Sequence, residues 1–216
     1  MLDILYLSDE EVQIQTNQRQ LRIAVIADTH IPDRVDRLHP QLLPAMQEQK
    51  IDLILHCGDV ISQDVTDTLK EIAPVLTVMG NRDAFFTGAN HPFKLLINVF
   101  STSIGMFHGF LSMQHYFTDK LQYILQGYHF EKYMQIGHSL FPTADILCYG
   151  HTHTAEIRRY RKQLIINPGT AGPLPMTGSS SWSVLDVYDN GKMSAFFLPL
   201  CGFKYKQHQW MPMMES

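Results

Sequence analysis

The sequence predicts an α/β fold. Apolar runs of the length of a buried strand recur along the chain, and stretches with helical spacing separate the first three of these runs. A strand, helix, strand order implies parallel pairing of the strands. With 216 residues, 45% of them hydrophobic, the chain is long enough for one well-covered core. We therefore expect a single domain over residues 1–216.

Residues 1–20 precede the first clear strand. They are polar in their second half, so we interpret them as an N-terminal extension that contributes one edge strand at residues 4–7. The apolar runs that follow have the length of central strands. They lie at residues 23–27, 53–56, 75–79, 103–107, 146–149 and 164–166.

Two helices are expected between the first three strands. Apolar side chains have helical spacing at residues 38–46 and again at residues 65–72. Ser62 and Asp64 precede the second of these stretches and are candidate N-terminal caps.

Two hairpins are expected among the remaining strands. Residues 94–100 and 103–107 are joined by a short connector, so the sheet is mixed or doubled. Residues 182–188 and 193–198 flank an Asp-Asn-Gly turn at residues 189–191, which is a strong signal for a two-residue hairpin. We expect this second hairpin to close a sheet edge.

Residues 110–141 form an insert with at least one expected helix, for which Thr118 is a candidate N-cap. The insert is rich in aromatic residues. Core packing is the favoured interpretation, and a partner surface or stacking on a substrate base is the alternative. We interpret its histidines, His115, His129 and His138, as surface residues outside any site.

The charge distribution limits the partners of the protein. A formal net charge of −4 and the lack of a Lys/Arg block argue against a surface that grips extended nucleic acid. No apolar run approaches the length that spans a bilayer, and the N-terminus is acidic and unlike a signal peptide. We expect a cytoplasmic protein with no membrane partner, and a homo-oligomer is left open.

The three cysteines, Cys57, Cys148 and Cys201, are odd in number and widely spaced, so a disulfide framework is not expected. Cys57 precedes Asp59 by two residues and is an alternative metal ligand. We favour a buried thiol, because a strand residue at that position points elsewhere.

Polar residues with ligand chemistry follow each expected central strand. Ligands bind at the carboxyl ends of strands in open α/β sheets, and the adjacent glycines allow the chain to turn sharply there. The pattern therefore predicts one shared site. The segments are Asp28-Thr29-His30, Gly58-Asp59, Gly80-Asn81-Arg82-Asp83, His108-Gly109, Gly150-His151-Thr152-His153 and Asn167-Pro168-Gly169.

The donors in these segments are imidazole nitrogens with carboxylate and amide oxygens. Such a donor set is suited to manganese, iron, zinc or nickel at expanded coordination. It is unlike the thiolate ligands of a closed structural zinc site. Two divalent ions fit better than one, because Asp59 has two oxygens and lies midway in the order of ligands. It can bridge ions about 3.5–4 Å apart. Manganese is the first expectation, with iron, zinc, nickel or magnesium as alternatives. We interpret the Asn167-Pro168-Gly169 segment as a turn that frames the cleft.

The order Asp-x-His, Gly-Asp, Gly-Asn, His-Gly and Gly-His-x-His resembles the calcineurin-like metallophosphoesterases. The short chain is similar to their compact bacterial and archaeal phosphodiesterase branch, which is related to the retromer scaffold subunit. The resemblance covers residues 21–198. It implies a metallophosphoesterase-like sandwich of two mixed sheets flanked by helices, in a four-layer α/β/β/α arrangement.

The resemblance also implies a ligand set and a reaction. Hydrolysis of a phosphoester by a metal-activated water is the implied chemistry. Asp59 would bridge two metal ions. The first ion would be held by Asp28, His30 and His153, and the second by Asn81, His108 and His151.

Arg82 departs from the family pattern, in which many phosphomonoesterases have histidine after Gly-Asn. Arginine stays charged at neutral pH and cannot donate a proton to the leaving group, but its planar fork can clamp phosphate oxygens. This favours diesters over monoesters. We expect Asp59, Asn81, Arg82 and Asp83 to be the catalytic group, with Asp83 orienting Arg82 or a ligand imidazole. A solvated surface position is the alternative for Arg82.

The sequence therefore predicts a binuclear metal-dependent phosphodiesterase acting on a small or accessible phosphodiester. The first alternative is a protein-binding scaffold of the same fold with weak or absent catalysis. A nuclease is the second, disfavoured by the acidic balance of charge.

Overall fold

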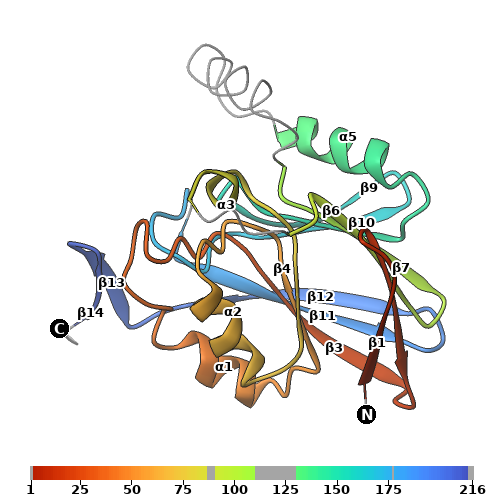
Figure 1. The fold of residues 1–216 in the computed structure, drawn as a ribbon, viewed down its shortest axis with the longest axis horizontal. Coiled ribbons are helices and arrows are strands. Elements are labelled where there is room, and N and C mark those ends of the chain that lie inside the picture. The colour runs from red at the N-terminus through yellow and green to blue at the C-terminus, as the bar shows by residue number, and fades with distance from the viewer. Residues whose placement is uncertain (1, 87–90, 110–129, 177, 214–216) are drawn as a thin grey trace.

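The computed structural model describes residues 2–86, 91–109, 130–176 and 178–213. Two β-sheets pack face to face, and helices cover the outer face of each sheet (Figure 1). Both sheets mix parallel and antiparallel pairs. The expected four-layer α/β/β/α architecture with mixed sheets is confirmed.

The larger sheet contains, within the described residues, β1 (Leu2–Ser8), β2 (Glu11–Thr16), β6 (Lys94–Val99), β7 (Thr102–Phe107), β8 (Ile146–Tyr149), β9 (Ala155–Tyr160) and β10 (Gln163–Pro168). Their spatial order is β1-β2-β6-β7-β8-β10-β9. β6 and β7 form the expected antiparallel hairpin. β7, β8 and β10 are parallel to one another, so their carboxyl ends lie at the same edge.

The smaller sheet contains, in the same ranges, β3 (Gln20–Ile26), β4 (Leu53–His56), β5 (Val75–Thr77), β11 (Ser181–Tyr188) and β12 (Met193–Pro199). Their order is β12-β11-β3-β4-β5. β3, β4 and β5 are parallel, which confirms the pairing predicted from the strand and helix order. β11 and β12 are antiparallel with β12 at the edge, so their hairpin closes an edge as expected. Its loop spans residues 189–192, longer than the two-residue turn that was predicted.

The described helices are α1 (Leu42–Glu48), α2 (Gln63–Lys70), α3 (Asn81–Phe86) and α5 (Phe130–Leu140). α2 is capped by Ser62, whose hydroxyl accepts a hydrogen bond from the Asp64 backbone N–H at 3.2 Å. α1 begins after Leu38, which we expected inside the helix. Pro40 explains the later start, because a proline disfavours helical conformation in the residue before it.

The insert is described only in part. The expected helix around Thr118 lies outside the described residues, and α5 forms the described end of the insert. Tyr133 and Met134 of α5 pack on the outer face of the larger sheet. In the part of the chain that the structure describes, no helix is both long enough and apolar enough to cross a bilayer.

The central strands are buried on both faces. In β4, Leu53 and Leu55 lie in the core between the two sheets, whereas Ile54 packs with the helices on the outer face. All three side chains are fully buried. Two-sided burial explains why this strand reads as a continuous apolar run and not as an alternating one.

The N-terminal extension contains two strands: β1 includes the expected strand at residues 4–7 and lies at the edge of the sheet, and β2 was not expected. β1 and β2 form an antiparallel hairpin, and β2 pairs in parallel with β6. Val12 and Ile14 of β2 are buried between the sheets. Their alternation with polar neighbours was the signal for this second strand.

A small hairpin of β13 (Phe203–Lys206) and β14 (Gln209–Pro212) lies against the segment that precedes α1. The Tyr205 hydroxyl donates to the Arg34 carbonyl at 2.9 Å, and the Trp210 indole donates to the Arg37 carbonyl at 3.1 Å. The C-terminal hairpin therefore braces the chain that follows β3.

Candidate metal centre

Five loops bring the candidate ligands to one edge of the two sheets. The loops after β3, β4 and β5 come from the smaller sheet, and those after β7 and β8 come from the larger sheet. The site therefore lies where the carboxyl ends of parallel strands from both sheets meet. In chain order, these loops carry Asp28, His30, Asp59, Asn81, His108, His151 and His153.

Five of these residues have a left-handed backbone conformation, which costs a residue other than glycine roughly 1–2 kcal/mol. Hydrogen bonds between loops stabilise this conformation at Asp28 and His30. Asp28 N–H donates to Gly58 O at 3.0 Å, and His30 N–H donates to Asp59 O at 3.1 Å. Backbone strain of this kind is concentrated at functional sites. The φ angles are 57° at Asp28, 53° at His30, 57° at Asp59, 72° at His151 and 54° at His153.

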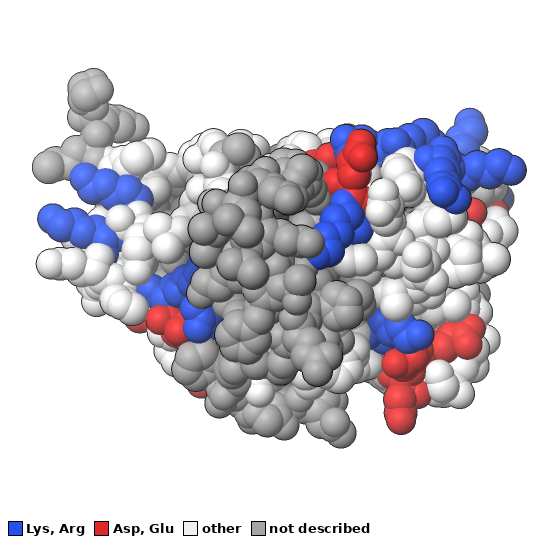
Figure 2. Space-filling view, turned by 90° about the horizontal axis from the view of Figure 1, so that it is seen from above, with Lys and Arg blue, Asp and Glu red and all other residues white. Residues whose placement is uncertain are grey.

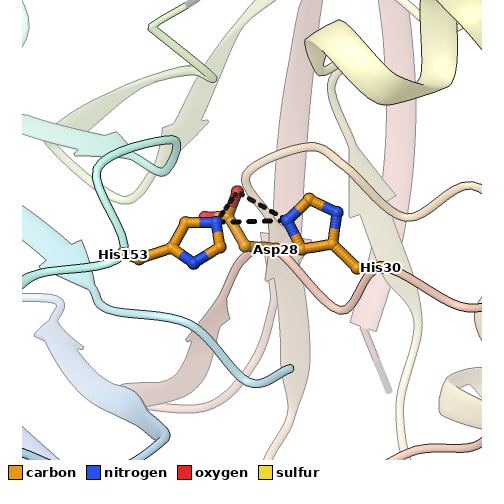
Figure 3. A group of neighbouring side chains, drawn as sticks. All are labelled: Asp28, His30 and His153. Atoms are coloured by element: carbon orange, nitrogen blue, oxygen red, sulfur yellow. Dashed lines mark hydrogen bonds and ion pairs between the residues drawn. The ribbon is translucent and has the colours of Figure 1, made fainter. Parts of the chain in front are cut away.

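The first donor group consists of Asp28, His30 and His153, which point toward one another in Figure 3. His153 Nε2 lies 3.4 Å from Asp28 Oδ1 and 3.1 Å from His30 Nε2. His30 Nε2 lies 3.8 Å from the same Asp28 oxygen. The Leu174 carbonyl lies 3.1 Å from His153 Nδ1 and accepts its hydrogen, which leaves the Nε2 lone pair directed into the group.

The second donor group is centred on Asn81 Oδ1. His108 Nε2 and His151 Nδ1 each lie 3.0 Å from this oxygen. His108 Nδ1 lies 2.7 Å from the Cys57 carbonyl and donates to it, so Nε2 is the His108 nitrogen that faces Asn81. Burial acts to lower the pKa of His108, but Asp59 and Asp28 outweigh it and raise the pKa above its ordinary value.

Asp59 lies between the two groups. Its Oδ2 is 3.8 Å from His30 Nε2, and its Oδ1 is 3.6 Å from His108 Nε2. Its loop and the next approach so closely that a Cβ on Gly80 would overlap the Asp59 carboxylate. Each oxygen of Asp59 therefore faces one donor group, as a bridging carboxylate requires.

Asp28 supplies a direct test of whether the residues fit a metal. Its Oδ2 accepts the His151 backbone N–H at 3.0 Å. Its Oδ1 is buried and has no hydrogen-bond partner within the described chain, and it lies 4.0 Å from His108 Nε2. A buried carboxylate oxygen without a partner is costly unless a cation neutralises it. The donor set therefore fits divalent ions.

Burial sets the protonation of the ligands. It lowers the pKa of His30 to about 2 and that of His151 to about 3, so both imidazoles are neutral and can offer a lone pair. Burial also raises the pKa of Asp59 to about 6. For Asp28 burial acts in the same upward direction, but the neighbouring His153, His108 and His30 outweigh it and hold the pKa well below its usual range.

Asp83 is fully buried and accepts three backbone N–H groups from the loops that carry the site. Its Oδ2 accepts from Asp59 at 2.9 Å and from Gly80 at 2.7 Å, and its Oδ1 accepts from Ile61 at 2.7 Å. These contacts make it the residue that ties the β4 and β5 loops together. Its predicted contact with Arg82 or a ligand imidazole stays a prediction.

Arg82 lies at the rim of the site. Its backbone N–H donates to Asp59 Oδ1 at 2.7 Å, which fixes the start of its side chain beside the candidate bridging carboxylate. Its Nε lies 3.5 Å from Asp33 Oδ2, and about a third of the side chain is exposed. The Arg82 side chain therefore lies beside Asp33, and its predicted contact with phosphate stays a prediction.

Two sequence interpretations are confirmed near the site. The Asn167 side chain forms a turn at the end of β10: its amide donates to the Gly150 carbonyl at 3.1 Å, and its Oδ1 accepts from the Gly169 N–H at 3.0 Å. The Cys57 thiol lies in the core between the sheets, and the three cysteines are free. His138 lies away from the ligands but is half-buried and not a surface residue as expected, with its Nδ1 2.8 Å from Gln163 Oε1. His115 and His129 lie outside the described residues.

Two residues near the ligands were missed by the sequence analysis. The Thr170 hydroxyl donates to the Asp28 carbonyl at 2.8 Å. Asp33 lies beside both His30 and Arg82. The signal for Asp33 was its position three residues after His30, but its orientation depends on a turn that the sequence pattern does not specify.

The fold and the donor set together define the metallophosphoesterase class. The chain belongs to the calcineurin-like phosphoesterase superfamily, whose domain matches residues 21–190. A probable metallophosphoesterase of Methanothermobacter thermautotrophicus is 33% identical over 183 residues, which cover 83% of this chain and 95% of that protein.

Solved structures show the same fold at lower sequence identity. Vacuolar protein sorting 29 from Cryptosporidium parvum has a TM-score of 0.66 at 20% identity, over 92% of this chain and 98% of that one. An archaeal phosphodiesterase has a TM-score of 0.56 at 18% identity, over 82% of this chain and 100% of that one. β1 and the C-terminal hairpin lie outside the residues matched by the superfamily.

Proposed function

We propose that this protein is a phosphodiesterase with a binuclear metal centre. The observation that carries the proposal is the position of Asp59, whose two oxygens face two separate groups of donors. Asp28, His30 and His153 would hold one ion, and Asn81, His108 and His151 the other. Manganese is the ion we propose first, on the mixture of nitrogen and oxygen donors.

Divalent ions held by these residues would supply a nucleophilic water and polarise the phosphoryl oxygens. The chain itself positions the groups around the substrate. Arg82 is held next to Asp59 through its backbone, and its guanidinium can clamp a phosphate oxygen that the ions do not bind. Asp83 keeps the two loops that carry Asp59 and Asn81 at a fixed separation.

The absence of a histidine at position 82 favours diesters. The transition state of a monoester is loose and places much of the developing charge on the leaving oxygen, so a monoester depends strongly on a proton donor, and arginine cannot supply that proton at neutral pH. A diester depends less on that proton and gains from a clamp on its charged non-bridging oxygens. We therefore propose a small or accessible phosphodiester as the substrate class.

Surface charge supports a small substrate over an extended nucleic acid. On the face shown in Figure 2, the described Lys and Arg side chains form separate groups, several of them beside acidic side chains. The largest basic group lies along the upper right edge of this view, and no basic stripe continues from it across the described surface of that face. This charge distribution and the net charge of −4 provide little electrostatic attraction for a long phosphate backbone.

The variant Arg82→His tests the substrate preference. With manganese present, the wild-type protein should hydrolyse diphenyl phosphate faster than phenyl phosphate, two esters whose phenolate leaving group benefits from a proton donor. The histidine variant should move the ratio of the two rates about tenfold or more toward the monoester, since general acid catalysis contributes about 10²–10⁴ in rate. The exposed Arg37→His is the matched control and should leave the ratio unchanged. A wild-type preference for the monoester would contradict the role given to Arg82.

A protein-binding scaffold of the same fold is the rival function, and the structural similarity to vacuolar protein sorting 29 favours it. One assay distinguishes the two functions. A scaffold without catalysis gives no manganese-dependent turnover of either ester, whereas a phosphodiesterase loses its turnover when a chelator removes the metal.

A further inference from the structure

Asp33 lies next to the first donor group because of a tight turn after His30. The Arg34 backbone N–H donates to the His30 carbonyl at 2.8 Å, which brings residue 33 back toward the imidazole. Tyr205 of the C-terminal hairpin donates to the Arg34 carbonyl at 2.9 Å on the other side of this turn. The position of Asp33 is therefore fixed by contacts from both ends of the segment.

Two buried polar atoms face each other across this turn. His30 Nδ1 and Asp33 Oδ2 are 4.0 Å apart. Neither atom has a hydrogen-bond partner among the residues that the structure describes. A buried polar atom without a partner is rare and costly in folded proteins, and His30 Nδ1 lies just beyond hydrogen-bond distance of Asp33 Oδ2, an oxygen that also forms an ion pair with Arg82.

The chemistry of a ligand imidazole explains this arrangement. When His30 gives its Nε2 lone pair to a metal ion, its hydrogen must be on Nδ1. That N–H needs an acceptor, and carboxylates commonly orient ligand histidines in this way. We propose that Asp33 is a positioning residue that accepts the Nδ1 hydrogen of His30 when the first ion is bound, an inference that rests on the proposed metal centre.

The same carboxylate oxygen also contacts Arg82. Arg82 Nε lies 3.5 Å from Asp33 Oδ2, so this oxygen stands between a metal ligand and the guanidinium proposed to clamp phosphate. Asp33 thereby limits where both side chains can lie. Its effect on catalysis is indirect, because the metal and the phosphate contact His30 and Arg82 and not Asp33.

Manganese binding measured by titration calorimetry tests the proposal without relying on turnover. Asp33→Ala should bind one of two manganese ions about 10–100-fold more weakly than the wild-type protein, the effect typical of losing a partner of a ligand histidine. The other ion should bind as before. Asp33→Asn keeps an oxygen acceptor and should recover part of the lost affinity, whereas Asp33→Leu fills the space without an acceptor and should not.

Asp36→Ala is the matched control, since Asp36 lies three residues further along and pairs with the exposed Arg37. It should bind both ions like the wild-type protein. If Asp33→Ala retains wild-type affinity for both ions, the positioning role is wrong while the metal centre stands. If the wild-type protein itself binds no manganese, the proposed function fails and the role of Asp33 fails with it. If Asp33→Ala does not fold, the manganese affinities of Asp33→Asn and Asp36→Asn are compared instead. Weaker binding of one ion by Asp33→Asn supports the positioning role, and equal binding by the two variants contradicts it.

Discussion

Replacing Asp59 by asparagine is expected to lower manganese-dependent hydrolysis of a phosphodiester by more than about 100-fold. Losing a residue that only orients a metal ligand costs up to about 100-fold, and losing a direct ligand should cost more. Asp59 is the only one of the seven candidate ligands whose two oxygens face both donor groups. An asparagine would keep one oxygen and turn a positively polarised amide toward the other ion. The value of kcat/KM for bis(p-nitrophenyl) phosphate measures the loss.

Asp67→Asn is the control for this change, because Asp67 is an exposed carboxylate on α2 that pairs with Lys70. It should retain wild-type kcat/KM. The bridging role of Asp59 would be refuted if Asp59→Asn kept more than about a tenth of the activity while binding the same amount of manganese. Even the loss of a residue that only orients a metal ligand typically lowers activity by about 10–100-fold.

Replacing Asp83 by asparagine is expected to destabilise the metal-free protein by about 3 kcal/mol. The buried carboxylate accepts N–H groups from Asp59, Gly80 and Ile61. An asparagine has one acceptor oxygen, so its amide group must face at least one of these donors. Each buried donor left without a partner costs about 1–3 kcal/mol, and losing the charge weakens the bonds that remain.

Denaturant unfolding in the presence of a chelator measures this loss without a contribution from metal binding. The exposed Asp3→Asn on β1 is the control and should unfold like the wild-type protein. A change below about 1 kcal/mol for Asp83→Asn would show that the loops do not depend on this carboxylate, because it is less than the cost of one unsatisfied donor.

The fold and the convergence of the candidate ligands could be predicted because both follow from the order of strands and loops. Parallel strands such as β3, β4 and β5 must direct their carboxyl ends to one edge, and the polar residues follow directly after those ends. Asp28 and Asp59 therefore had to lie near each other. Which ion each ligand holds stays a prediction.

The supporting contacts could not be predicted from sequence. Asp83 acts through three backbone N–H groups whose directions depend on the conformation of two loops, and a side-chain pattern carries no such information. Asp33 faces His30 only because the turn closes on itself and the C-terminal hairpin braces it. Long-range contacts of this kind leave no periodic signal in the chain.

Metal content per chain is the most direct test of the binuclear centre. The purified protein would be loaded with manganese, passed over a desalting column to remove free ions and analysed for bound metal, with Asp59→Asn alongside it. Two ions per wild-type chain and fewer in the variant are expected, because Asp59 faces both donor groups. A wild-type chain that retains no manganese, zinc or iron under these conditions would contradict the account.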